Sequence, residues 1–254
     1  MPTTRMKEQL SNKERALVAA KLSGIAYKNE KPAIAAAKKL GFAWVKLISR
    51  DGAEVLIAKD RNDLWFAFRG TEPSKLNDVM ADLNVIKNAA KAGGRVHSGF
   101  QKEVNDLWMD VLKELEHNDQ LKVRKDVYMT GHSLGAAMAT IMSSRAKHNE
   151  SLNDPVELYT YGSPRVGWRK YVKSLDVVHH RWRNNNDIVT KVPLLLMGYV
   201  HHGELHYITS DCKKGKPGFI DWCKGIWSGI KEKKFDSIGD HDIQSYHDQI
   251  EKAL

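Results

Sequence analysis

One stretch of the chain holds a serine in a setting that suits nucleophilic chemistry. Residues 131–135 read Gly-His-Ser-Leu-Gly, with Ser133 at the centre. An apolar run at 123–130 precedes it and an alanine-rich stretch at 134–147 follows it, which predicts a strand, a sharp turn and a helix. In the G-x-S-x-G motif this turn exposes the serine hydroxyl at a sheet edge, and the glycines let strand and helix approach closely. We therefore expect Ser133 to be a nucleophile, the alternative being a chance match to a short pattern.

A serine nucleophile needs a base, and the base needs an acid that orients it. The acid candidate is Asp187, which follows the predicted strand 177–184 at the edge where parallel strands place their sites. A helix cap or a turn is the alternative role for this aspartate.

Five histidines qualify as the base because they follow Asp187 in the chain. They are His201, His202, His206, His241 and His247. The first three lie at or near a predicted strand, where a structural role is the alternative, and His247 lies on the predicted last helix, where we expect a surface position. His241 lies in a predicted loop, and loops commonly carry catalytic residues. We therefore expect His241 to be the base.

The elements that position these residues alternate along the chain. Helices are predicted at 11–26, 32–40, 73–83, 104–115, 134–147 and 243–253, and strands at 42–48, 54–58, 63–68, 123–130, 156–161, 177–184 and 205–208. The first three strands follow one another through short turns, which predicts an antiparallel start, and the later alternation predicts parallel strands with crossover helices. The expected fold is α/β, with a central, mostly parallel sheet, antiparallel lead-in strands and helices on both faces. We expect one domain over residues 1–254.

Composition limits the class of protein. The chain has 254 residues, is 42% hydrophobic and carries a formal charge of +9. A basic excess suits phospholipid or nucleic acid, but the basic residues are scattered, so we expect no nucleic-acid site. Two cysteines, Cys212 and Cys223, exclude a disulfide framework. Residues 1–31 lack the apolar run of a signal peptide, so we expect a cytoplasmic protein. No apolar run approaches the ~18 residues of a membrane span, so we expect no transmembrane segment.

Several motifs resemble, in order, those of the class 3 lipases, the family of the filamentous-fungal lipases. They lie at residues 68–71, 78–83, 96–100, 131–135, 160–167, 185–193 and 240–246. The resemblance covers roughly residues 15 to 250. It implies the α/β-hydrolase fold, with residues 73–89 as a lid segment and 211–240 as an insertion.

The resemblance also implies roles for single residues. Ser133 would be the nucleophile, Asp187 the acid and His241 the base, with an oxyanion hole from the N–H groups of Thr71 and Leu134 and the Thr71 hydroxyl. The implied activity is hydrolysis of acylglycerols or short-chain esters without a cofactor or a metal. Phospholipase A-type and aryl- or feruloyl-type esterase activities are the alternatives within this chemistry. A lipid-binding module without catalysis is the alternative from another class, and the intact set of serine, acid and base argues against it.

Two segments are expected to meet lipid. In the lid segment, apolar residues recur at steps of three or four, so they form one stripe that would cover the acyl groove and bind substrate. These lid residues are Leu76, Val79, Met80 and Leu83. The resemblance also implies that Tyr27 lies near the substrate site. Within the insertion, residues 219–234 place tryptophans and isoleucines on one helical face beside lysines. Such a basic amphipathic helix suits an anionic lipid surface, and packing on the protein's own core is the alternative.

Overall fold

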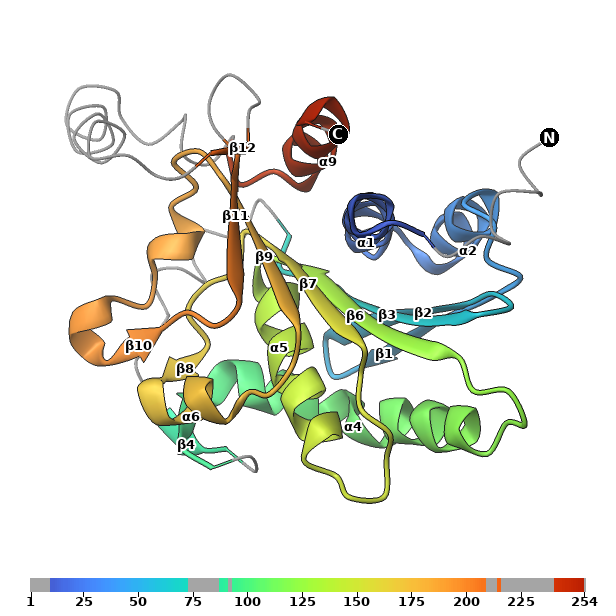
Figure 1. The fold of residues 1–254 in the computed structure, drawn as a ribbon, viewed down its shortest axis with the longest axis horizontal. Helices are drawn as coiled ribbons and strands as arrows, with labels where there is room; N and C mark the ends of the chain where they lie inside the picture. The colour runs from blue at the N-terminus through green and yellow to red at the C-terminus, as the bar shows by residue number, and fades with distance from the viewer. Residues whose placement is uncertain (1–9, 73–86, 91–92, 209–213, 216–239, 254) are drawn as a thin grey trace.

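The computed structural model describes residues 10–72, 87–90, 93–208, 214–215 and 240–253 of the chain. A sheet of eight strands runs through this part in the order β1-β2-β3-β6-β7-β9-β11-β12 (Figure 1). The strands are β1 (Trp44–Arg50), β2 (Ala53–Lys59), β3 (Asp63–Phe68), β6 (Asp126–His132), β7 (Glu157–Tyr161), β9 (His179–Asn184), β11 (Glu204–Ile208) and β12 (Lys214–Gly215). Each strand lies within a few residues of a predicted one, except β12, which the sequence analysis does not anticipate.

The direction of the strands changes at β3. Strands β1, β2 and β3 are antiparallel neighbours, whereas β3, β6, β7, β9 and β11 run parallel, and β12 returns antiparallel at the far edge. Central parallel strands have both faces covered, which explains why residues 127–132 of β6 are all buried. The mostly parallel sheet with an antiparallel start is therefore confirmed.

Helices cover both faces of the sheet (Figure 1). One face carries α1 (Asn12–Ile25), α2 (Glu30–Lys39) and α9 (Ile243–Ala253), and the other carries α4 (Ser98–Asp119), α5 (Leu134–Lys147) and α6 (Arg169–Ser174). Each set of helices buries its own apolar cluster against the sheet. Helix α5 is buried from Gly135 to Ala146, because it passes between the sheet and α4.

Polar contacts fix α1 against the centre of the sheet. Ser11 and Glu14 form the capping box that the sequence predicts, so the helix begins at Asn12. The hydroxyls of Ser23 and Thr130 lie 2.9 Å apart in the buried contact between α1 and β6. Helix α1 is therefore held in place beside the strand that ends at the serine turn.

A second, four-stranded antiparallel sheet was not predicted. Its order is β10 (Tyr199–Val200), β8 (Gly167–Trp168), β5 (Arg95–His97) and β4 (Lys87–Ala89). Strands of two or three residues are too short to carry an alternating pattern, so they leave no periodic signal in the sequence. Helix α4 also begins at Ser98, earlier than the predicted residue 104, directly after β5.

Two predicted segments lie largely outside the described residues. The lid segment, with Leu76, Val79, Met80 and Leu83, is described only at its end, where residues 87–89 form β4. The insertion at 211–240 is described only at residues 214–215 and 240. None of the helices in the described ranges combines the length and the apolar composition that crossing a bilayer requires.

We expect Gly135→Ala to lower the free energy of unfolding by about 1–3 kcal/mol or more, because an added Cβ would overlap the carbonyl oxygen of Phe68 and lie 2.8 Å from the carbonyl carbon of Arg69. Urea denaturation followed by circular dichroism measures this change. The matched control is Gly24→Ala in α1, where the nearest atom to an added Cβ is a side-chain carbon of Ile243 at 3.6 Å. The control should leave stability unchanged or raise it by up to about 1 kcal/mol. Equal stability of both variants would contradict the close approach at Gly135.

Candidate active site

Ser133 occupies a strained turn between β6 and α5. Its backbone has φ 58° and ψ −128°, a left-handed conformation that costs a residue with a side chain of order 1–3 kcal/mol. Strand β6 ends at His132 and α5 begins at Leu134, so the turn consists of Ser133 alone. Its side chain is 1% exposed. The strand, turn and helix that the sequence predicts around Ser133 are therefore present.

Two glycines allow this turn to form. A Cβ at Gly131 would overlap the carbonyl oxygen of Gly135 and lie 2.7 Å from the backbone nitrogen of Ala136. Gly135 lies in turn against the backbone at the end of β3, around Phe68. Only glycine fits where strand and helix approach so closely.

Asp187 lies in the loop after β9 and is completely buried. Its carboxylate accepts hydrogen bonds from three groups: the Nδ1–H of His241 at 2.9 Å, the hydroxyl of Tyr246 at 2.6 Å and the backbone N–H of Val189 at 2.9 Å. Because Nδ1 of His241 donates to the carboxylate, Nε2 is the nitrogen that can accept a proton in the neutral ring. The structure thus brings the predicted acid and the predicted base into contact.

His132 fixes the backbone of the predicted base, His241. Its Nε2 lies 2.6 Å from the carbonyl oxygen of His241, and its Nδ1 lies 2.9 Å from the hydroxyl of Tyr27. Burial, together with the neighbouring His241 ring, holds the pKa of His132 well below its ordinary value, so the ring is neutral. A carbonyl oxygen only accepts, so Nε2–H donates to it and Nδ1 accepts from the Tyr27 hydroxyl. Burial also raises the pKa of Tyr27, which keeps that hydroxyl protonated.

Ser133 and the predicted base His241 each have one buried side-chain polar atom that lacks a partner in the part of the chain that the structure describes. Among the described residues, neither Oγ of Ser133 nor Nε2 of His241 has a hydrogen-bond partner. These are the two atoms that a serine–histidine pair would join. Catalytic hydrogen bonds are often long in the free enzyme and tighten when substrate binds. The arrangement therefore leaves a nucleophile oxygen and a proton acceptor available at the buried serine turn.

The predicted oxyanion donors lie where two strands end together. Phe68 at the end of β3 pairs with Gly131 near the end of β6, so Thr71 and Leu134 leave the sheet at the same edge. Leu134 is the first residue of α5, and the first N–H groups of a helix have no partner within it. Gly70 brings the Thr71 loop close, because a Cβ there would lie 3.2 Å from the Cβ of Ser133. The positive end of the α5 dipole favours negative charge at this point.

The other histidines after Asp187 have partners elsewhere. Nε2 of His201 lies 2.8 Å from the carbonyl oxygen of Thr190, and the rings of His202 and His206 pair with those of two residues in β9. His247 pairs with the neighbouring Asp248 on α9. Within the described ranges, His241 is the histidine that contacts the acid.

Two residues of the 240–246 motif contact the site in ways that the sequence did not predict. Tyr246 donates to Asp187, and its oxygen accepts the backbone N–H of Asn184 at 2.9 Å. Asp240 accepts hydrogen bonds at 3.1 Å from the Asn186 backbone and the Asn185 side chain. A signal existed for Tyr246, because it shares the apolar side of the predicted last helix with Ile250, and a buried tyrosine hydroxyl needs a partner. Asp240 is marked in the sequence only as the first residue of the 240–246 motif.

We expect Tyr246→Phe to lower the free energy of unfolding by about 1–3 kcal/mol, because the buried Asp187 carboxylate loses a donor and the Asn184 N–H loses its acceptor. Urea denaturation measures the loss. The control is Tyr128→Phe, since Tyr128 is 3% exposed and its hydroxyl has no hydrogen bond among the described residues. That variant should change stability by less than about 0.5 kcal/mol. An effect of Tyr246→Phe no larger than the control would contradict the contact.

Comparisons with known proteins agree with this geometry. The family described as lipase (class 3) matches residues 65–197, just over half of the chain. A lipase from Rhizomucor miehei is 31% identical over 179 residues, which cover 66% of this chain and 48% of that protein. The secreted mono- and diacylglycerol lipase A from Penicillium cyclopium is 39% identical over 105 residues, covering 40% of this chain and 33% of that protein.

The structural comparison gives the same fold. The triacylglyceride lipase of Rhizomucor miehei matches with a TM-score of 0.64 at 23% identity, over 80% of this chain and 83% of that chain, which shows the α/β-hydrolase fold. The chain spans about half the length of the Rhizomucor and Rhizopus lipases that it matches in sequence. Since the family match covers more than half of the chain and includes both the serine turn and the buried aspartate, this chain belongs to the class 3 lipases.

Proposed function

We propose that this protein is a serine hydrolase of carboxylic esters, acting on acylglycerols or short-chain esters. The observation that carries the proposal is the hydrogen bond from Nδ1 of His241 to the buried Asp187 carboxylate, in a fold that holds Ser133 in a left-handed turn. Family membership supports the same chemistry. The names of two relatives, a lipase and a mono- and diacylglycerol lipase, support acylglycerols as the substrate class.

In the proposed reaction Nε2 of His241 removes the proton of Ser133 while Oγ attacks the ester carbonyl. Asp187 orients the ring and stabilises its positive charge. The tetrahedral oxyanion is held by the N–H groups of Thr71 and Leu134, each worth on the order of 3 kcal/mol in the transition state. The C–O bond breaks, the alcohol leaves with the proton from His241, and water then hydrolyses the acyl-enzyme by the same steps.

We expect Ser133→Ala to reduce ester hydrolysis by about 10⁴-fold or more, because the covalent route is lost. His241→Ala should cause a comparable loss, whereas the control His247→Ala should retain most of the activity, since His247 pairs with Asp248 on α9. The assay uses p-nitrophenyl esters of increasing chain length beside emulsified triglyceride and phosphatidylcholine, so that it also separates esterase, lipase and phospholipase activities. Near-normal turnover by a folded Ser133→Ala protein would end the proposal.

We also propose that residues 219–234 bind an anionic lipid surface. This segment lies outside the described residues, so the support is its sequence, in which Trp222 and Trp227 fall on one helical face beside lysines. The formal charge of +9 favours the same partner.

A vesicle assay tests this second proposal. Tryptophan fluorescence should shift to the blue when vesicles containing phosphatidylserine are added at low salt, where electrostatic attraction is strongest. Trp227→Ala should weaken vesicle binding, whereas Trp44→Ala should not, since Trp44 is a 40% exposed residue of β1, far along the chain from this segment. Absence of binding at low salt would leave the apolar face as ordinary core.

A further inference from the structure

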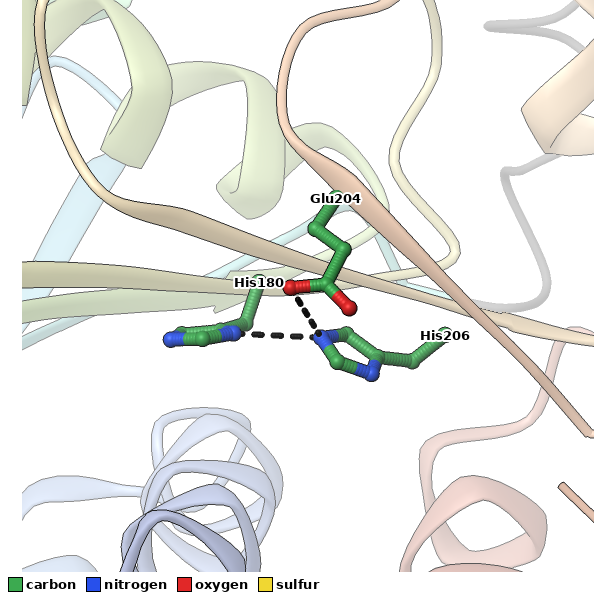
Figure 2. A group of neighbouring side chains, drawn as sticks. All are labelled: His180, Glu204 and His206. Carbon is green, nitrogen blue, oxygen red and sulfur yellow. Dashed lines mark hydrogen bonds and ion pairs between the residues drawn. The ribbon is translucent and has the colours of Figure 1, made fainter.

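Three side chains that can ligate a metal ion lie close together on two neighbouring strands of the sheet, far from Ser133 in the sequence. His180 is in β9, and Glu204 and His206 are in the parallel strand β11. Glu204 pairs with His180 across the two strands, and His206 lies two residues further along β11, so all three side chains project from the same face (Figure 2). The strand register therefore brings these three residues together.

The separations of the donor atoms suit one small cation. Nδ1 of His180 lies 3.1 Å from Nε2 of His206, and that nitrogen lies 3.9 Å from a carboxylate oxygen of Glu204 (Figure 2). All three donor atoms lie within 4.8 Å of one another. Ligand atoms about 2.0–2.2 Å from a tetrahedral zinc ion are roughly 3.3–3.6 Å apart. The two imidazole nitrogens are close to this spacing, and rotation of the exposed Glu204 side chain would bring its carboxylate oxygen to the same ion.

The two imidazole rings are held in place by aromatic neighbours. The ring of Tyr159 stacks on His180 with centroids 4.9 Å apart, and the ring of Trp182 stacks on His206 at 4.7 Å. His206 is 7% exposed, whereas Glu204 is exposed to solvent. Fixed rings reduce the conformational entropy that binding an ion would cost. The exposed Glu204 carboxylate lets an ion reach the site from solvent and supplies the third donor.

We propose that His180, Glu204 and His206 form a binding site for a single first-row divalent cation, with Zn²⁺ as the expected ion and water completing its coordination. Imidazole nitrogens select zinc and its neighbours, whereas Mg²⁺ and Ca²⁺ require oxygen ligands. In the hydrogen bond between the rings, one of the facing nitrogens carries a hydrogen. Metal binding moves this hydrogen to the other nitrogen of its ring, so that both facing nitrogens present a lone pair.

The bound ion would link β9 to β11. Strand β9 leads directly into the Asp187 loop, so the ion would stabilise the strand on which the acid depends. The site can be tested separately from ester hydrolysis, because its donor atoms belong to His180, Glu204 and His206, whereas the proposed catalytic pair is His241 and Asp187. Binding to the folded state alone raises the melting temperature as the ion concentration rises.

The test uses the full chain without a histidine tag, freed of metal with a chelator. Calorimetric titration with Zn²⁺ should give one equivalent bound, Co²⁺ should give the visible absorption of a low-symmetry site, and Mg²⁺ should give neither. Glu204→Gln and His206→Gln should each weaken zinc binding by at least the 10- to 100-fold that loss of an outer partner typically causes. They should also remove the zinc-dependent rise in melting temperature.

Two histidine variants serve as controls. His202→Gln should bind zinc normally, because Nδ1 of His202 lies 3.0 Å from Nδ1 of His179 but this pair has no carboxylate as a third donor in the described structure. His117→Gln, an exposed position on α4, should also bind normally. Glu204 is exposed, so its variant should fold even if His206→Gln does not. Absence of zinc binding, unchanged binding by Glu204→Gln, or loss of binding in His202→Gln would each overturn the proposal.

Discussion

A buried negative charge at Asp187 constrains the whole site. Moving a carboxylate out of water costs several kcal/mol unless hydrogen bonds replace its hydration. Here the donors come from three places: the Val189 backbone in the acid's own loop, His241 in a loop far along the chain, and Tyr246 on α9. The charge is stable only when β9 and α9 are both in place. The fold therefore assembles the proposed acid and the proposed base as one unit.

Hydrogen bonds between neutral groups link His241 to the region around the serine turn. The neutral ring of His132, next to the serine in sequence, donates to the carbonyl oxygen of His241 and accepts from Tyr27 near the end of α1. The Tyr27 hydroxyl also packs closely against Gly70, since a Cβ on this glycine would overlap it. Gly70 directly precedes Thr71, a predicted oxyanion donor. Such a set of contacts restricts the positions of the proposed nucleophile Ser133, the proposed base His241 and the loop that holds Gly70. Preorganisation of this kind is a main source of rate enhancement in acyl transfer.

The sequence predicted what local pattern determines. Strand β6, helix α5 and helix α9 were expected close to their observed bounds, because each carries a clear apolar pattern between recognisable ends. The pairing of Asp187 with His241 followed from chain order and loop position. The second sheet, the contact of Tyr246 with the acid, and the cluster around His206 depend instead on which strands become neighbours. The packing of the whole chain sets the strand order, so this order cannot be predicted from any single stretch of the sequence.

Successive side chains of β9 point to opposite faces of the sheet, and this limits the sequence changes that the strand can accept during evolution. Its odd-numbered residues include His179, which contacts Thr160 and His202, while His180 and Trp182 face the opposite side beside aromatic rings. Inserting or deleting one residue in this strand would exchange the two faces and misplace the acid loop at the same time. Point substitutions alter one face only. Relatives that retain the fold should therefore differ in β9 by replacement alone, and changes in length should accumulate in the connections at either end.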